Sequence, residues 1–227
     1  MAFQMKKRRE MILGAILGLL IFLLPFPSHS QGGGQGFVPL RKVAVLPFLI
    51  IRPAEGETMA KGLWGEFFFR AGEVPSRAGS EVMAILYRQL FHLGRCEVTP
   101  LGQAMAAVEG VDPIVLRQDP LGEAVRLGRQ LGVYAVVIGG VYRFEQRQGS
   151  ALGVERPASV AFDAHLVRLK DKKVIWSGRF DETQRSLSEN LLKASTFVKA
   201  GGRWVTVEKL TAIGVESVLR TFPSLTL

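Results

Sequence analysis

The sequence predicts an α/β protein of the α+β type, a three-layer sandwich in which helices cover a mixed, mainly antiparallel sheet of about five strands. Three β-rich runs follow one another at 131–144, 157–169 and 174–183, separated by turn-forming residues. This order is typical of neighbouring strands in an antiparallel sheet. An earlier apolar run, 43–48, indicates a strand buried on both faces. Apolar residues spaced by three and four between 76 and 131 predict covering helices.

The first 30 residues form a hydrophobic signal or anchor helix that precedes the folded domain. Four cations at 6–9 come before an apolar stretch of 14 residues, 11–24, and small residues follow up to Ser30. This is the layout of a secretory signal. Because about 20 apolar residues are needed to span a bilayer, we expect cleavage after Ser30 and a periplasmic protein. The alternative is an uncleaved helix that anchors the protein in the inner membrane through 11–24.

The charge and the cysteine count indicate which partners and which kinds of cross-link can be expected. The formal charge of +9 falls to +6 when the leader's four cations and one anion are removed. Cations scattered in this way are typical of a solvated surface, which would also suit an anionic envelope surface. Nucleic acid is not an expected partner of an exported protein. The single cysteine, Cys96, excludes an internal disulfide and is predicted to be a small buried apolar residue.

The mature chain divides into three predicted parts. Residues 31–40 begin with QGGGQG and form a flexible spacer. The α/β domain covers 41–183. Residues 184–227 form a C-terminal helical cap packed on the same domain.

The stretch 52–75 shows no strand or helix periodicity and is predicted to be a loop. It carries four aromatic residues, Trp64, Phe67, Phe68 and Phe69. In one interpretation the loop is a lid that packs its aromatic rings on the core. In the other, the rings form an exposed apolar patch for a partner protein or a membrane, because long loops on rigid scaffolds often carry binding.

Local capping signals predict the helix boundaries. A helix over 76–93 ends at Gly94. Asp112-Pro113 and Asp119-Pro120 each combine an N-cap residue with proline in the first helical position, which is a specific start signal. Thr206 is placed to cap a last helix.

Capping residues and a proline also predict two helices after Thr183. A helix is predicted over 189–199, with Ser188 as its cap. The last helix is expected to stop before Pro223.

Two glycines, Gly139 and Gly140, interrupt the β-branched run of the central strand. A glycine inside a strand marks a bulge or a close approach by another backbone. We expect a closely packed helix as the cause. The alternative is a ligand that approaches Gly139 and Gly140 and is bound by the basic residues Arg143 and Arg147. Trp176 is predicted to place its ring on the core and to need a partner for its N–H.

The sequence contains no catalytic, cofactor-binding or metal-binding set. It lacks G-x-S-x-G and the glycine-rich phosphate-binding loops. His92 and His165 are not at ligand spacing. His165 and Asp163 are predicted to form a cross-strand surface pair rather than a catalytic dyad, and Asp181 and Glu182 to be solvated. We therefore expect neither an enzyme nor a cofactor.

Three segments resemble a bacterial envelope superfamily. They are RKVAVLPF at 41–48, LGVYAVVIGGVYRF at 131–144 and VIWSG at 174–178. They are similar to the opening strand, the central strand and the tryptophan strand of the superfamily that includes the curli-secretion lipoprotein CsgG, the penicillin-binding-protein activator LpoB and the N-terminal domain of TolB. The likeness covers roughly 41–183.

The resemblance implies a non-catalytic α/β module, in the periplasm or at the outer membrane, that acts in the assembly, secretion or activation of an envelope machine. The sequence departs from the superfamily in two respects. The lipid-attachment cysteine of CsgG and LpoB is missing, and the amphipathic hairpins of the curli channel are not evident. The resemblance does not extend to the part from Ser186 onward.

The leading hypothesis is an exported scaffold or adaptor that binds an envelope protein through Trp64, Phe67, Phe68 and Phe69 or through the sheet edge. A second hypothesis is an oligomeric secretion-channel subunit in contact with the membrane. A third is a periplasmic ligand- or glycan-binding module that uses the strand at 139–140 and the basic residues after it.

Overall fold

The computed structural model describes residues 40–65, 67–150, 154–184 and 204–226. The predicted leader, almost all of the spacer and the predicted helix over 189–199 lie outside the described residues. Among the residues that are described, no helix is both long enough and apolar enough to cross a bilayer.

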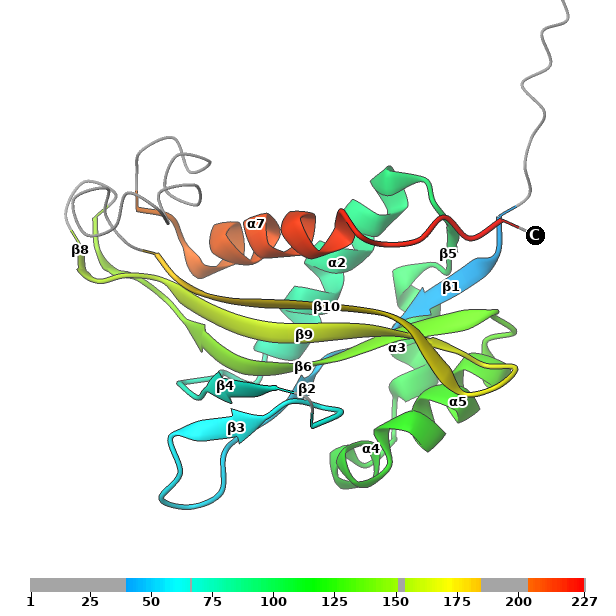
Figure 1. The fold of residues 1–227 in the computed structure, drawn as a ribbon, viewed down its shortest axis with the longest axis horizontal. Coiled ribbons are helices and arrows are strands. Elements are labelled where there is room, and N and C mark those ends of the chain that lie inside the picture. Colours follow the sequence, from blue (N-terminus) through cyan, green and yellow to red (C-terminus); the bar gives the residue numbers. More distant parts are fainter. Residues whose placement is uncertain (1–39, 66, 151–153, 185–203, 227) are drawn as a thin grey trace, which may run out of the picture. The chain divides into compact units, whose positions relative to one another are not determined.

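The centre of the fold is a mixed sheet, as predicted, with the strand order β10-β9-β6-β1-β5 (Figure 1). The three long strands, β6, β9 and β10, form antiparallel ladders. The short strands β1 and β2 run parallel to β6, and β5 runs parallel to β1. These strands are β1 (Lys42–Val45), β2 (Leu49–Ile50), β5 (Glu97–Val98), β6 (Ala135–Glu145), β9 (Ser159–Arg168) and β10 (Lys173–Thr183).

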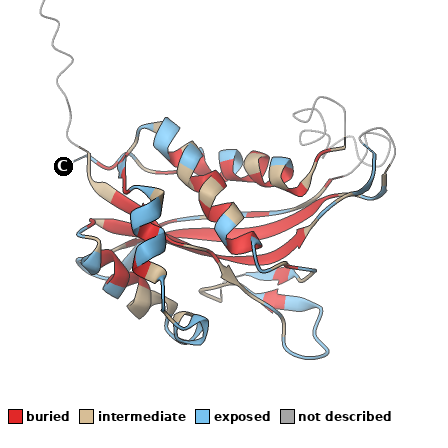
Figure 2. Cartoon of the chain, turned by 180° about the vertical axis from the view of Figure 1, so that it is seen from behind, coloured by how far each residue is buried: buried red, intermediate tan, exposed pale blue. Residues whose placement is uncertain are grey.

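Helices cover both faces of this sheet (Figures 1 and 2). On one face, Ala135 and Val137 of β6 pack with helices α2 and α7. On the other face, Val136 and Ile138 pack with helices α3 and α5. Because successive residues of a strand point to opposite faces, burial on both faces explains why the first four residues of β6, 135–138, are all apolar. The helices are α2 (Ala78–Leu93), α3 (Leu101–Val108), α4 (Pro113–Gln118), α5 (Pro120–Gln130) and α7 (Val207–Leu219).

The predicted capping residues occupy the helix ends. Asp112 Oδ1 accepts a hydrogen bond of 2.7 Å from the N–H of Ile114, and Asp119 Oδ1 accepts one of 2.8 Å from Gly122. Gly94 ends α2 in the left-handed conformation, with φ of 65°, where a residue with a Cβ is disfavoured. Thr206 Oγ1 accepts from the N–H of Lys209 at the start of α7. These local signals are confirmed.

The side chains of Trp176 and Cys96 also lie as predicted. The indole N–H of Trp176 donates to Thr221 Oγ1 over 3.0 Å, and the ring packs in the core. Cys96 is 5% exposed. Burial raises the pKa of its thiol to about 12, so the side chain is neutral and behaves as a small apolar group.

The stretch 52–75 differs from its prediction as a loop, because it contains an antiparallel hairpin. Strands β3 (Met59–Lys61) and β4 (Phe68–Arg70) pair with each other and lie against the sheet below β6 (Figure 1). Each strand has three residues, which is too short for an alternating apolar pattern to be visible in the sequence. A second short hairpin joins β6 to β9 through β7 (Gln148–Gly149) and β8 (Val154–Arg156).

Candidate functional site

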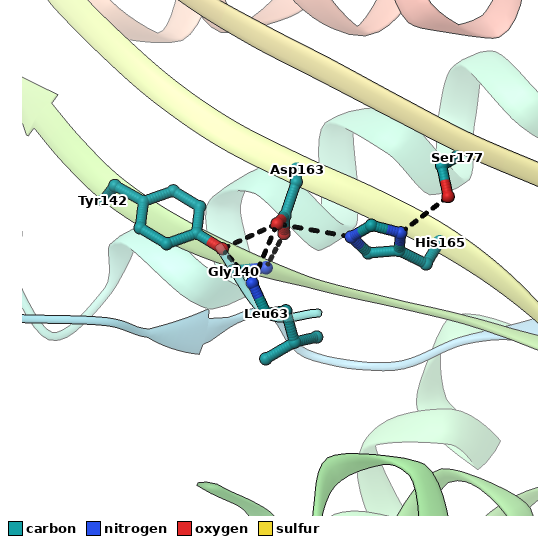
Figure 3. A network of polar contacts seen from close by, with 6 residues as sticks. All are labelled: Leu63, Gly140, Tyr142, Asp163, His165 and Ser177. Atoms are coloured by element: carbon teal, nitrogen blue, oxygen red, sulfur yellow. Dashed lines mark hydrogen bonds and ion pairs between the residues drawn. The ribbon is translucent and has the colours of Figure 1, made fainter. Parts of the chain in front are cut away.

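A network of buried polar groups lies between the sheet and the β3–β4 hairpin (Figure 3). Asp163 and His165 project from β9 and are 4% and 6% exposed. Tyr142 of β6 is fully buried beside them. Its position follows from a β-bulge, since the register between β6 and β9 shifts between Val141 and Arg143. A bulge re-aims the side chain of the extra residue, and here that side chain is the phenol of Tyr142.

The carboxylate of Asp163 is the centre of this network. Its Oδ1 accepts a hydrogen bond from the N–H of Gly140 over 2.8 Å. Its Oδ2 accepts from the hydroxyl of Tyr142 over 2.6 Å and from the N–H of Leu63 over 3.2 Å. Tyr142 Oη in turn accepts from the same N–H of Leu63 over 2.9 Å. Three donors thus offset the cost of burying a carboxylate.

His165 extends the network toward β10. Its Nδ1 lies 2.8 Å from Ser177 Oγ, and its Nε2 lies 3.2 Å from Asp163 Oδ2. The ring of Trp64 covers the imidazole, with ring centroids 4.4 Å apart. The prediction that Asp163 and His165 form a surface pair is therefore wrong. Both are buried because a segment about 100 residues earlier in the chain lies over them.

The side chains of Asp163, His165 and Ser177 are of the three types found in a hydrolytic triad, but they are not arranged as in one. In such a triad the carboxylate orients the imidazole through a hydrogen bond. Here His165 Nε2 is close to Asp163 Oδ2, but it makes no hydrogen bond to any described residue. The carboxylate is instead occupied by Gly140, Tyr142 and Leu63. The arrangement is suited to fixing Leu63, not to activating Ser177.

The network fastens the aromatic stretch to the sheet at three points. The backbone of Leu63 is held by Asp163 and Tyr142. The ring of Trp64 packs on His165. The ring of Phe69 stacks on Tyr142, with centroids 4.0 Å apart and planes 7° from parallel. Burial, together with the nearby charge of Asp163, raises the pKa of Tyr142 far above its usual range, so the phenol keeps the proton that it donates.

The structure separates the four aromatic residues that the sequence grouped. Phe69 is 1% exposed and belongs to the core, and Trp64 is half-buried on His165. Phe67 and Phe68 are 43% and 63% exposed. The lid interpretation thus describes Phe69 and Trp64, and an exposed apolar patch is left at Phe67 and Phe68.

The solvent-facing side of the hairpin mixes apolar and cationic side chains. In the β3–β4 register, Met59 stands opposite Arg70 and Lys61 stands opposite Phe68. All four are exposed. The guanidinium of Arg179, on β10, lies over the ring of Phe67 at 4.3 Å from its centroid, a cation–π contact. We call the set Met59, Lys61, Phe67, Phe68 and Arg70 the hairpin face.

The two strand glycines have a different cause from the one predicted. A Cβ at Gly139 would lie 2.1 Å from the carbonyl oxygen of Asp163 and 2.4 Å from Cε1 of Phe48. A Cβ at Gly140 would meet the hydroxyl of Tyr142 at 2.7 Å. The neighbouring strand and two aromatic rings, not a helix, therefore require glycine here.

The basic residues after these glycines do not act together. Arg143 is 5% exposed and donates to Ser159 Oγ, to the carbonyl of Arg70 and to Asp181. Asp181 is exposed, as predicted, and it is also the partner of this buried guanidinium at 2.6 Å. Arg147 is half-buried in the turn between β6 and β7. No group of three metal-ligating side chains occurs among the described residues.

Comparisons with known proteins give structural neighbours only. No family model matches the chain, and no curated protein matches it. It is similar to the PelC dodecamer structure from Paraburkholderia phytofirmans, with 13% identity, 82% of this chain and 89% of that chain covered, and a TM-score of 0.44. It is also similar to the lipoprotein GNA1162 from Neisseria meningitidis, with 15% identity, 71% and 99% covered, and a TM-score of 0.44.

The C-terminal domain of LpoB from Salmonella enterica is a further neighbour, with 16% identity, 66% of this chain and 87% of that chain covered, and a TM-score of 0.38. LpoB is one of the proteins whose motifs the sequence resembles. Likeness at these identities and TM-scores does not transfer a function to this chain.

Proposed function

We propose that the protein is an exported, non-catalytic adaptor of the bacterial cell envelope that binds a partner protein through the hairpin face. The observation that supports this proposal is the buried carboxylate of Asp163, which is committed to holding the backbone that leads into Phe67 and Phe68. A binding surface of this kind gains affinity when its anchors are held rigidly before the partner arrives.

The exposure of the two phenylalanines is the second support. A ring of this size contributes a large hydrophobic gain when it is buried, yet Phe68 leaves 63% of its surface in water. The adjacent residue Phe69 is fully packed, so the hairpin can bury an aromatic side chain where its position allows. Clustered exposed apolar side chains on a fixed element are typical of interaction sites.

The charges on the hairpin face indicate the chemistry of the partner. Lys61 and Arg70 stand beside Phe68 and Met59, and Arg179 lies over Phe67. A complementary surface would have an apolar centre for the rings and acidic side chains at its rim. The envelope location rests on the leader at 5–30, which has the layout of an export signal.

The test compares the exposed pair Phe67 and Phe68 with a third exposed phenylalanine, Phe91. The double variant Phe67→Ser, Phe68→Ser should keep the thermal midpoint within about 2 °C, because exposed substitutions change stability little. It should lose the envelope protein that crosslinks to the wild-type chain. Phe91→Ser is the matched control, since Phe91 is 59% exposed on α2, away from the hairpin.

Three outcomes would count against the proposal. One is a crosslinked partner that survives in the double variant. Another is a partner lost equally in Phe91→Ser. A third is binding of the wild-type protein, but not the double variant, to anionic phospholipid vesicles in the absence of other proteins. That result would assign the hairpin face to a membrane.

A further inference from the structure

A second site lies where β6 ends, β9 begins and β10 ends. A polar cavity of about 360 Å³ opens where β4, β6, β8, β9 and β10 come together. This volume is at the lower end of the range of small-molecule sites, ~300–1,000 Å³. The lining consists of Arg70, Ala71, Arg143, Glu145, Arg156, Pro157, Ser159 and Thr183.

The buried guanidinium of Arg143 forms a fixed part of this lining. It is held by Ser159 Oγ at 2.5 Å, by the carbonyl of Arg70 at 2.6 Å and by Asp181 at 2.6 Å. These bonds use three of the five N–H groups that a guanidinium offers. The remaining donors are held in a fixed plane, which is the arrangement that binds carboxylate and phosphate groups through paired hydrogen bonds.

The hydroxyls of Ser159 and Thr183 add a further donor. Their oxygens lie 2.6 Å apart, and either one can donate to the other. Two hydroxyls carry two protons and this contact uses one. Because Ser159 Oγ also accepts from Arg143, donation by Ser159 to Thr183 would leave the proton of Thr183 for a group in the cavity.

The charges around the cavity favour an anion. Arg70 and Arg156 are exposed at its rim, and neither forms an ion pair with a described residue. Of the two nearby carboxylates, Asp181 is paired with Arg143. Glu145 accepts from the N–H of Glu73 over 3.2 Å. The lining therefore contains three guanidinium groups and one carboxylate, Glu145.

We propose that this cavity binds an oxyanion, a phosphate or carboxylate group of a small ligand. Arg143 is the fixed, buried cation of the site, and Arg70 and Arg156 are two further cations at its rim. This site shares Arg70 with the hairpin face, but its other lining residues lie outside that face, and its occupancy does not depend on the adaptor function. Of the four residues expected from the sequence to meet a ligand, it includes Arg143 but not Gly139, Gly140 or Arg147.

Isothermal titration with inorganic phosphate and, separately, with citrate tests the proposal at constant ionic strength. We expect saturable binding of at least one of the two, accompanied by shifts of the Ser159 and Thr183 amide resonances. Arg156→Gln and Arg70→Gln should each weaken binding roughly tenfold or more, because each removes a charge-assisted hydrogen bond. Both positions are exposed, so folding should be retained.

The matched control is Arg88→Gln, which removes one exposed cation from α2 and should leave binding unchanged. Tighter binding of phosphate would assign a phosphorylated ligand, and tighter binding of citrate a carboxylated one. The absence of saturation with either probe up to about 10 mM, a weak-binding limit, would overturn the proposal. An equal loss in Arg88→Gln would do the same, because it would show binding to diffuse surface charge.

Discussion

Two of the parts that cover the sheet, the helices α2 and α7 and the β3–β4 hairpin, are attached to it by different kinds of interaction. On the face of α2 and α7, contact with β6, β9 and β10 is made by apolar side chains in one continuous cluster. At the hairpin, the apolar cluster is small, with Ala60, Phe69, Tyr142 and Ala161 as its buried members. Further attachment comes from polar contacts and one ring contact: the N–H of Leu63 donates to Asp163 and Tyr142, Arg143 donates to the carbonyl of Arg70, and Trp64 packs on His165.

This contrast follows from the size of the elements. Helix α2 has 16 residues, and its apolar positions recur along one side, so it can bury a stripe of side chains. Each strand of the hairpin has three residues and buries one of them. A two-stranded hairpin of this size has little stability of its own. The buried carboxylate supplies directional contacts that fix the position of the hairpin, whereas apolar contact alone is not directional.

The largest expected effect comes from breaking the polar attachment. Asp163→Ala should lower the free energy of unfolding by about 3–5 kcal/mol, because it leaves the N–H of Gly140 and the hydroxyl of Tyr142 without an acceptor in a buried site and removes one of the two acceptors of the Leu63 N–H. Urea unfolding measures the change. A loss below about 1 kcal/mol would contradict the role of the carboxylate.

A deletion on the helical face provides the comparison. Leu86 of α2 is fully buried in the apolar cluster, and Leu86→Ala should cost about 2–5 kcal/mol through lost transfer energy and a cavity. The change should leave the hairpin ordered, as reported by the fluorescence of a probe attached near Met59. Disorder of the hairpin in this variant would show that the two coverings are not independent.

A smaller effect is expected where the network meets the strand backbone. Gly139→Ala places a methyl group against the carbonyl of Asp163 and the ring of Phe48. This crowding should cost about 1–3 kcal/mol in urea unfolding. The same substitution at Gly102, where an added Cβ meets no atom within 4 Å, is the control and should be neutral or slightly stabilising.

The features that the sequence predicted correctly are formed by residues that are close together along the chain. The caps at Asp112 and Asp119 and the stop at Gly94 are interactions within one turn, and the central strand is a long, mostly apolar run. The sheet, its helical covering and the helix boundaries could therefore be predicted.

The candidate site could not be predicted in the same way, because its contacts join distant parts of the chain. The N–H of Leu63 meets Asp163 across 100 positions, and the carbonyl of Arg70 meets Arg143 across 73. Two charged residues in strands, Asp163 and Arg143, were the available signal. A charge at a position that alternation assigns to a covered face indicates a buried partner, but it does not identify that partner.

The central claim is that the polar network fixes the hairpin independently of the apolar core, and amide hydrogen exchange in Tyr142→Phe tests it most directly. This variant keeps the ring that stacks on Phe69 and removes the hydroxyl that contacts Asp163 and Leu63. The account predicts faster exchange at Leu63 and across residues 59–70, with unchanged exchange across 82–90 of α2. Equal acceleration in both regions, or no change at Leu63, would contradict it.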